Sequence, residues 1–183
     1  MTGRSSTVVL MCGLPGSGKT TYARGLVRRG FARLSIDEEV WRLLGQRDAG
    51  LVLAAEEFDR LKEEVRGRQR RELVELLRAW RDVVVDYSCW SRAAREDYQQ
   101  LVEQHGGRWE LVHLKADRAT LERRLEARNR EEGADSVTVD RALFDRYVAM
   151  FEEPVGEGEQ LVPQPAPPGG RAGLNGGQAP SSR

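Results

Sequence analysis

One segment near the N-terminus limits the folds open to this chain more than any other. The apolar run from Val8 to Cys12 is followed by GLPGSGKT at residues 13–20 and then by a segment with helical spacing. These eight residues fit the pattern GxxxxGK[ST], in which glycines let backbone N–H groups curl around phosphate oxygens. A helix beginning there adds unpaired N–H groups and the positive end of its dipole. The order strand, loop, helix therefore predicts a nucleoside triphosphate site, a P-loop, in an α/β domain.

The loop and the start of the helix supply most of the residues expected to hold the nucleotide. Lys19 is expected to reach the β- and γ-phosphates, and the Thr20 hydroxyl is expected to bind the magnesium ion that accompanies ATP. The expected nucleotide-binding residues of this segment are Gly13, Leu14, Pro15, Gly16, Ser17, Gly18, Lys19, Thr20 and Thr21.

Length and charge limit the class of protein. The 183 residues suffice for one α/β domain with a buried core and are too few for two ordinary ones. Lys plus Arg and Asp plus Glu both number 29, so no net charge draws the chain to nucleic acid or a membrane. No run has the length of a membrane span, and no N-terminal segment reads as a secretion signal. We expect a cytoplasmic protein with no membrane partner.

Strands alternate with helices along the chain, which predicts a largely parallel sheet covered on both faces. Strands are expected at residues 8–12, 31–36, 83–86 and 109–114, with a weak edge strand at 160–162. Helices are expected after the loop, at 38–44 and 51–80, and beginning at the capping residues Ser91, Asp117 and Asp140. Gly67 could break the longest helix. The expected fold is α/β: a three-layer α/β/α P-loop NTPase with a mostly parallel sheet of about five strands and a helical lid.

The composition changes near the C-terminus. Twelve of the last 28 residues are Gly or Pro, and large apolar side chains nearly vanish. We therefore assign residues 1–155 to the folded domain and 156–183 to a disordered tail.

Two aspartates at predicted strand ends are expected to have different roles, because ligands of open parallel sheets bind at the carboxyl ends of the strands. Asp86 ends an apolar strand of the kind that supplies a carboxylate to the magnesium ion in P-loop proteins. Asp37 ends the second strand, where it could accept the proton of an attacking hydroxyl. The plainer interpretation of Asp37 is a helix N-cap.

An arginine series precedes the aperiodic segment 131–136. Arg124 and Arg128 are four residues apart and therefore share a helix face, which would let both approach a transferring phosphoryl group from a lid. The alternative is a solvated basic face paired with the neighbouring glutamates.

Other candidate residues carry weaker signals. Trp41, Tyr87 and Trp90 follow the two aspartates and could line an acceptor pocket, although each could equally serve packing. The charged run at residues 62–72 could contact RNA, but its mixed signs favour an ordinary solvated helix. The histidines and cysteines show no zinc spacing, which leaves magnesium as the expected metal.

Taken together, these motifs resemble the polynucleotide-kinase-like P-loop kinases, a group often labelled an AAA domain that includes zeta-toxin-type and chloramphenicol phosphotransferase-type kinases. The resemblance spans about residues 7–153 and rests on GLPGSGKTT, Ser35-Ile36-Asp37, VVVD, Arg128-Asn129, and Val139-Asp140 before a helix with Tyr147. It implies that Lys19 and Thr20 bind ATP and magnesium, that Asp37 is the base, and that Arg128 acts from the lid. Polynucleotide kinases carry an arginine three residues after the base, where this chain has Val40, and this departure argues against a nucleic-acid 5′ end as substrate.

The expected function is transfer of the γ-phosphoryl group of Mg-ATP to a hydroxyl of a small molecule or, less favoured, a nucleic-acid end. A hydrolysing ATPase usually has a glutamate after the metal aspartate, where this chain has Tyr87, and the guanine-reading Asn-Lys-x-Asp of a GTPase is absent. A regulatory module that binds nucleotide without turnover remains an alternative.

Overall fold

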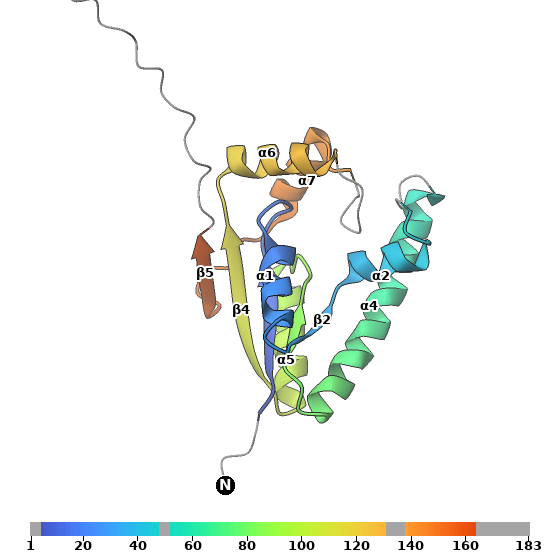
Figure 1. Ribbon diagram of the computed structural model, residues 1–183. Coiled ribbons are helices and arrows are strands. Elements are labelled where there is room, and N and C mark those ends of the chain that lie inside the picture. Colours follow the sequence, from blue (N-terminus) through green and yellow to red (C-terminus); the bar gives the residue numbers. More distant parts are fainter. Residues whose placement is uncertain (1–4, 48–51, 131–137, 164–183) are drawn as a thin grey trace, which may run out of the picture.

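A five-stranded parallel sheet forms the centre of the protein (Figure 1). The computed structural model describes residues 5–47, 52–130 and 138–163. The strands are β1 (Thr7–Cys12), β2 (Ala32–Leu34), β3 (Val83–Val85), β4 (Arg108–Lys115) and β5 (Glu159–Pro163). Their order across the sheet is β2-β3-β1-β4-β5, so the first strand of the chain is the central one. The helices are α1 (Lys19–Val27), α2 (Ile36–Leu43), α4 (Ala55–Arg78), α5 (Arg92–Gln104), α6 (Arg118–Arg128) and α7 (Arg141–Met150).

Helices cover both faces of the sheet because successive side chains of a strand point to opposite faces. In β1, Val8 and Leu10 pack with apolar residues of α4 and α5. Val9 and Met11 pack on the other face with Ala23 and Leu26 of α1. All five residues from Val8 to Cys12 are buried, as expected for a parallel sheet between two helical layers. The three-layer P-loop fold predicted from the sequence is therefore confirmed.

Helix boundaries follow local capping. The side chains of Ser91, Asp117 and Asp140 each accept a hydrogen bond from the backbone N–H three residues on, which confirms the predicted starts of α5, α6 and α7. The suggested break at Gly67 is wrong, because α4 continues through it. Val65, Leu73 and Leu77 are buried on the core side of α4, so packing outweighs the low helix propensity of one glycine.

The folded domain extends beyond residue 155, where the composition placed its end. The predicted edge strand exists as β5, which pairs in parallel with β4 from Leu111↔Glu159 to Lys115↔Pro163. Residues 164–183, the remainder of the predicted tail, lie outside the described residues.

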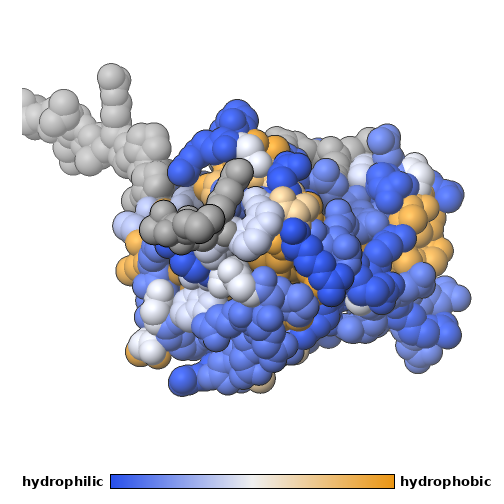
Figure 2. Space-filling view, turned by 90° about the horizontal axis from the view of Figure 1, so that it is seen from below, coloured by the Kyte–Doolittle hydropathy of each residue, from blue (hydrophilic) through white to orange (hydrophobic). Residues whose placement is uncertain are grey.

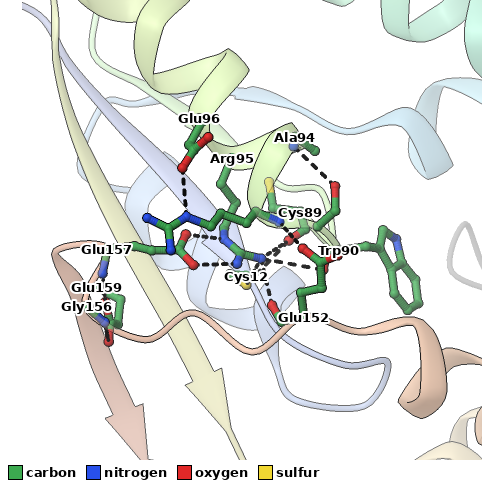
Figure 3. A network of polar contacts seen from close by, with 12 residues as sticks. Cys12, Cys89, Trp90, Ala94, Arg95, Glu96, Glu152, Gly156, Glu157 and Glu159 are labelled. Atoms are coloured by element: carbon green, nitrogen blue, oxygen red, sulfur yellow. Dashed lines mark hydrogen bonds and ion pairs between the residues drawn. The ribbon is translucent and has the colours of Figure 1, made fainter.

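A buried ion pair fastens the segment that leads into β5 (Figure 3). Arg95 of α5 is fully buried, and its Nε and Nη2 donate to the two carboxylate oxygens of Glu157 at 2.6 and 2.7 Å. Its Nη1 donates to the backbone carbonyls of Cys89 and Glu152 at 2.9 and 2.8 Å. The Arg95 guanidinium thus joins α5, the segment after β3 and the segment before β5 at one point.

The surface seen in Figure 2, from below the view of Figure 1, is mainly hydrophilic, with apolar side chains in small groups. Among the helices described, none has the length and apolar character needed to cross a membrane.

Candidate phosphoryl-transfer site

The loop between β1 and α1 has the backbone geometry of a phosphate cradle. Gly13 has a φ of +144°, and a Cβ there would lie 2.6 Å from the carbonyl oxygen of Leu114, so no other residue fits. Gly18 is the N-cap of α1 in a left-handed conformation, which aims the start of this helix at the loop. Ser17 is fully buried in the loop, and its Oγ has no hydrogen-bond partner among the described residues. Glycines placed where side chains cannot go, beside an unused donor, are suited to hold phosphate oxygens.

Lys19, the first residue of α1, lies over the loop. Its Nζ donates to the carbonyl oxygens of Gly13 at 2.8 Å and Leu14 at 2.9 Å. Burial lowers the pKa of Lys19 below its ordinary value, and the negative charges of Asp86 and Asp37 oppose this effect. The two carboxylates that the sequence singled out therefore act on the same ammonium group, although they lie 49 positions apart in the chain.

Asp86 comes directly after β3 and is held by an arginine of the neighbouring strand. Arg33 of β2 donates to its Oδ2 from Nε at 2.9 Å and from Nη2 at 2.7 Å. The Asp86 side chain is only 3% exposed. Burial would lower the pKa of Arg33, but Asp86 and Glu38 raise it above its ordinary value, so the guanidinium stays charged. Sequence reasoning missed Arg33. The only signal for it is a charged residue inside one predicted strand, while a neighbouring strand ends in a carboxylate.

Asp37 does not end a strand and is not an N-cap, contrary to both expectations. β2 ends at Leu34, Ser35 is the N-cap of α2, and Asp37 is the second residue of that helix. The Ser35 Oγ accepts a hydrogen bond from the backbone N–H of Glu38 at 3.4 Å, so a cap role for Asp37 is excluded. Asp37 nevertheless lines the pocket described below.

A buried glutamine fixes the start of α2. The Nε2 of Gln69, on α4, donates to the Ser35 carbonyl at 3.1 Å and to Glu39 at 2.5 Å. Its Oε1 accepts a hydrogen bond from the Tyr87 hydroxyl at 2.6 Å. Gln69 therefore connects the turn that carries Asp37 with the residue that follows Asp86.

Helix α6 lies across the P-loop, at the top of the molecule in Figure 1. Arg124 donates from Nη1 to the Gly16 carbonyl at 3.2 Å. A Cβ at Gly16 would lie 3.1 Å from the Leu121 carbonyl oxygen and 3.3 Å from Leu125 Cγ, so loop and helix are in close contact. This is the position expected of a lid, although residues 131–137, which include the predicted lid loop, lie outside the described residues.

Helix α7 brings a tyrosine to the same side. Burial raises the pKa of Tyr147, Asp37 raises it further, and the positive charge of Arg128 opposes the increase. Asn129, at the end of α6, exchanges two hydrogen bonds with the backbone of Val139 at 3.0 and 3.2 Å and so ties α6 to the start of α7.

These elements enclose a pocket of about 840 Å³, which lies in the size range of ligand sites. Of the residues expected at the site, those that line it are Pro15, Gly16, Gly18, Lys19, Thr20, Thr21, Asp37, Asp86, Arg124 and Arg128, with Tyr87 and Trp90. Gly13, Leu14 and Ser17 shape the loop behind this lining. Trp41 is not part of the lining, so of the two roles considered for it the place in the pocket is wrong.

The wall of the pocket formed by α4 and α5 contains residues that sequence reasoning assigned to solvent or left out. Phe58, Lys62, Arg66 and Arg70 of α4 and Ala94, Asp97 and Tyr98 of α5 belong to it. The charged run at 62–72 is thus not an ordinary solvated helix throughout. A spacing of four residues among its cations is the one signal that could have been noticed.

No group of three or more His, Cys, Asp or Glu side chains capable of holding a metal occurs within residues 5–47, 52–130 and 138–163. Cys12 and Cys89 are both free and buried, and burial raises their pKa to about 11 and about 12.

Comparison with known proteins agrees with this geometry. The sequence profile of a family described as AAA domain matches residues 8–154. No curated protein matches the chain. A gluconokinase from Sinorhizobium meliloti 1021 is similar in structure, with 21% identity and a TM-score of 0.55, over 88% of this chain and 85% of the gluconokinase. Kti12 from Chaetomium thermophilum, in complex with ADP-AlF3, is 17% identical with a TM-score of 0.59, over 85% of this chain and 88% of Kti12.

A chain of the Pnkp1/Rnl/Hen1 complex is 21% identical with a TM-score of 0.53, over 68% of this chain. The present chain spans only 40% of that longer one. At such identities the structural likeness establishes a shared P-loop fold and no more. The profile match covers most of the sequence, and the chain therefore belongs to the AAA domain family.

Proposed function

We propose that this protein is a kinase that transfers the γ-phosphoryl group of ATP to a hydroxyl of a bound acceptor. The observation that carries the proposal is the convergence of Lys19, Asp37, Asp86, Arg124 and Arg128 on one pocket. A phosphate cradle, two carboxylates and two lid arginines are the parts that phosphoryl transfer needs.

In the proposed mechanism the P-loop backbone and Lys19 hold the β- and γ-phosphates. Thr20 and Asp86 would hold a magnesium ion, which would supply positive charge beside the phosphates. The glycine cradle and the Asp86 carboxylate oriented by Arg33 fit such a complex.

Asp37 accepts the proton of the acceptor hydroxyl as its oxygen forms a bond to the γ-phosphorus. The bond from that phosphorus to the bridging oxygen breaks, and ADP leaves with the electron pair. Arg124 and Arg128 stabilise the negative charge on the transferring group from the lid side. The close contact of α6 with the P-loop supports this role and would limit water at the reaction centre.

The test is transfer of labelled γ-phosphate from Mg-ATP to a panel of hydroxyl compounds, with ATP binding measured separately by calorimetry. Lys19→Ala is expected to abolish transfer. Asp37→Asn is expected to lower transfer by roughly 10²- to 10⁴-fold while ATP binding persists, because a general base is worth about that much.

Asp145→Asn is the matched control, since this carboxylate is about half exposed, pairs with Arg118 and lies outside the pocket lining. Near-normal transfer by Asp37→Asn would remove Asp37 from the role of base. ATP binding with no labelled acceptor would reduce the assignment to a nucleotide-binding module.

A further inference from the structure

A row of three cations on α4 faces the pocket, apart from the groups that serve the nucleotide. Lys62, Arg66 and Arg70 are spaced by four residues and therefore share one helix face. All three are half-buried and line the pocket, whereas Arg60 on the same helix is exposed and does not. In the mechanism proposed above, the P-loop, Lys19, Arg124 and Arg128 already serve the phosphates of ATP, which leaves the row available for another anion.

Two cations of the row pack against aromatic rings. Arg70 lies 5.4 Å from the ring centroid of Tyr98, and Lys62 lies 4.7 Å from that of Phe58. Arg70 is also held by both oxygens of Asp97. Rings and carboxylate restrict these long side chains, so less rotational freedom is lost when they bind an anion.

Arg66 lies at the centre of this wall. Burial raises the pKa of Tyr87 and Tyr98, and the positive charge of Arg66 opposes the increase for both. The two tyrosines form an edge-to-face pair with centroids 5.7 Å apart. Tyr87 in turn bonds Gln69, which holds the turn that carries Asp37. The cationic wall and the proposed base are therefore linked through one set of contacts.

Each cation of the row has a carboxylate partner, but two of these three partners lie outside the pocket lining. Asp59 and Glu63 pair with Lys62 and Arg66 from positions three residues away on the same helix, where they are 76% and 66% exposed and outside the pocket lining. Exposed pairs of this kind are weak and exchange readily for another anion. Asp97 is the one carboxylate among the lining residues of α4 and α5.

We propose that the acceptor is itself an anion: a small hydroxylated compound that carries a phosphate or carboxylate group. This inference rests on the kinase function proposed above and names its substrate class. Lys62, Arg66 and Arg70 hold the anionic group, and the hydroxyl faces Asp37. The acceptor O–H gives its proton to Asp37, its oxygen bonds the γ-phosphorus, and ADP departs.

The surroundings of the row favour a small anion over a nucleic-acid strand. A strand needs a positive path that continues beyond the reacting end. Here exposed charges of both signs surround the row, with Asp59, Glu63 and Asp97 lying among Arg60, Arg68 and Arg71, and the whole chain has no net charge. Carboxylates thus interrupt the positive charge outside the pocket, and no continuous positive path leads away from the row.

The experiment compares matched acceptors that differ in one anionic group. Ribose is paired with ribose 5-phosphate, glucose with gluconate and adenosine with adenosine 3′-monophosphate, and a 5′-hydroxyl oligonucleotide forms a separate arm. Transfer from labelled Mg-ATP is measured with wild type, Arg66→Gln and the matched control Arg60→Gln, and melting curves verify that both variants fold.

We expect an anionic member to be labelled at least tenfold better than its neutral partner. Arg66→Gln should raise the KM for that acceptor about tenfold, because the loss of one hydrogen bond to a charged group lowers affinity by about that factor. The KM for ATP should not change, and Arg60→Gln should behave as wild type. A preference that survives Arg66→Gln, equal labelling of neutral and anionic members, or labelling of the oligonucleotide alone would overturn the inference and leave the kinase standing. ATP binding without any labelled acceptor would overturn the kinase and the inference together.

Discussion

The buried pair of Arg95 and Glu157 provides a quantitative test of the fold. Glu157→Gln removes the negative charge and keeps the shape, so a guanidinium that is fully buried loses its ionic partner. Breaking a buried pair from one side destabilises proteins by about 3–5 kcal/mol. Arg95 keeps its bonds to the Cys89 and Glu152 carbonyls, and the new amide can still accept one hydrogen bond, which places the loss near the lower end. We expect a loss of about 3 kcal/mol, or a fall in Tm of roughly 6–12 °C for a chain of this length.

The assay is urea unfolding followed by tryptophan fluorescence. Glu153→Gln is the matched control, because Glu153 lies in the same segment and pairs with Lys115 at a surface where both side chains are about half exposed. Its loss is expected to stay below about 1 kcal/mol. If the two variants were equally stable, the buried pair would not hold the C-terminal segment, and our account of the domain boundary would fail.

Three further predictions concern acidity, the lid and the metal aspartate. Hydrogen bonds from Arg95 hold the pKa of Glu157 below its ordinary 4.5, so this carboxylate stabilises the fold fully above about pH 4.5 and loses that effect as the pH falls through the lowered pKa. The free energies of unfolding of wild type and Glu157→Gln should therefore converge in acid. A difference in free energy that stays constant with pH would contradict this. Gly16→Ala should weaken ATP binding more than Gly30→Ala, because both glycines have positive φ but only a Cβ at Gly16 would meet α6. Calorimetry that gives equal ATP affinities for the two variants would argue against the contact between the P-loop and α6. Arg33→Gln should destabilise the protein by about 3 kcal/mol in urea unfolding, because it removes the guanidinium paired with the buried Asp86 carboxylate. A change under about 1 kcal/mol would mean that Lys19 or solvent balances the Asp86 charge and would contradict a structural role for Arg33.

The sequence predicted the features that depend on local chemistry. The P-loop, the N-caps at Ser91, Asp117 and Asp140 and the apolar strand before Asp86 each need only a few neighbouring residues to be recognised, and the structure has all of them. The strand that follows Gly158 lies in a segment rich in Gly and Pro, where only the triplet Gln160 to Val162 indicated it.

The features that sequence reasoning missed depend on contacts between distant segments. Asp37 was placed at a strand end because the strand was expected to continue through Ile36, whereas the Ser35 cap starts the helix at Ile36, two residues earlier than expected. Whether Lys62 and Arg66 face solvent or a cavity depends on where α4 packs, which mixed charges along one helix do not determine. The domain boundary depends on Glu157 meeting Arg95, 62 residues away.

The central position of β1 has a consequence for the order in which the protein can fold during synthesis. The strand leaves the ribosome first, yet it pairs with residues 83–85 and 108–113, which are made much later. Until those strands emerge, the nascent chain exposes five consecutive apolar residues that have no neighbouring strand to pair with. Because domains dominated by such distant pairings fold slowly, this interval is where chaperones and proteases would compete for the chain. A ribosome that stalls before Glu157 would release a product in which the Arg95 guanidinium lacks its carboxylate partner. We expect such a product to be degraded.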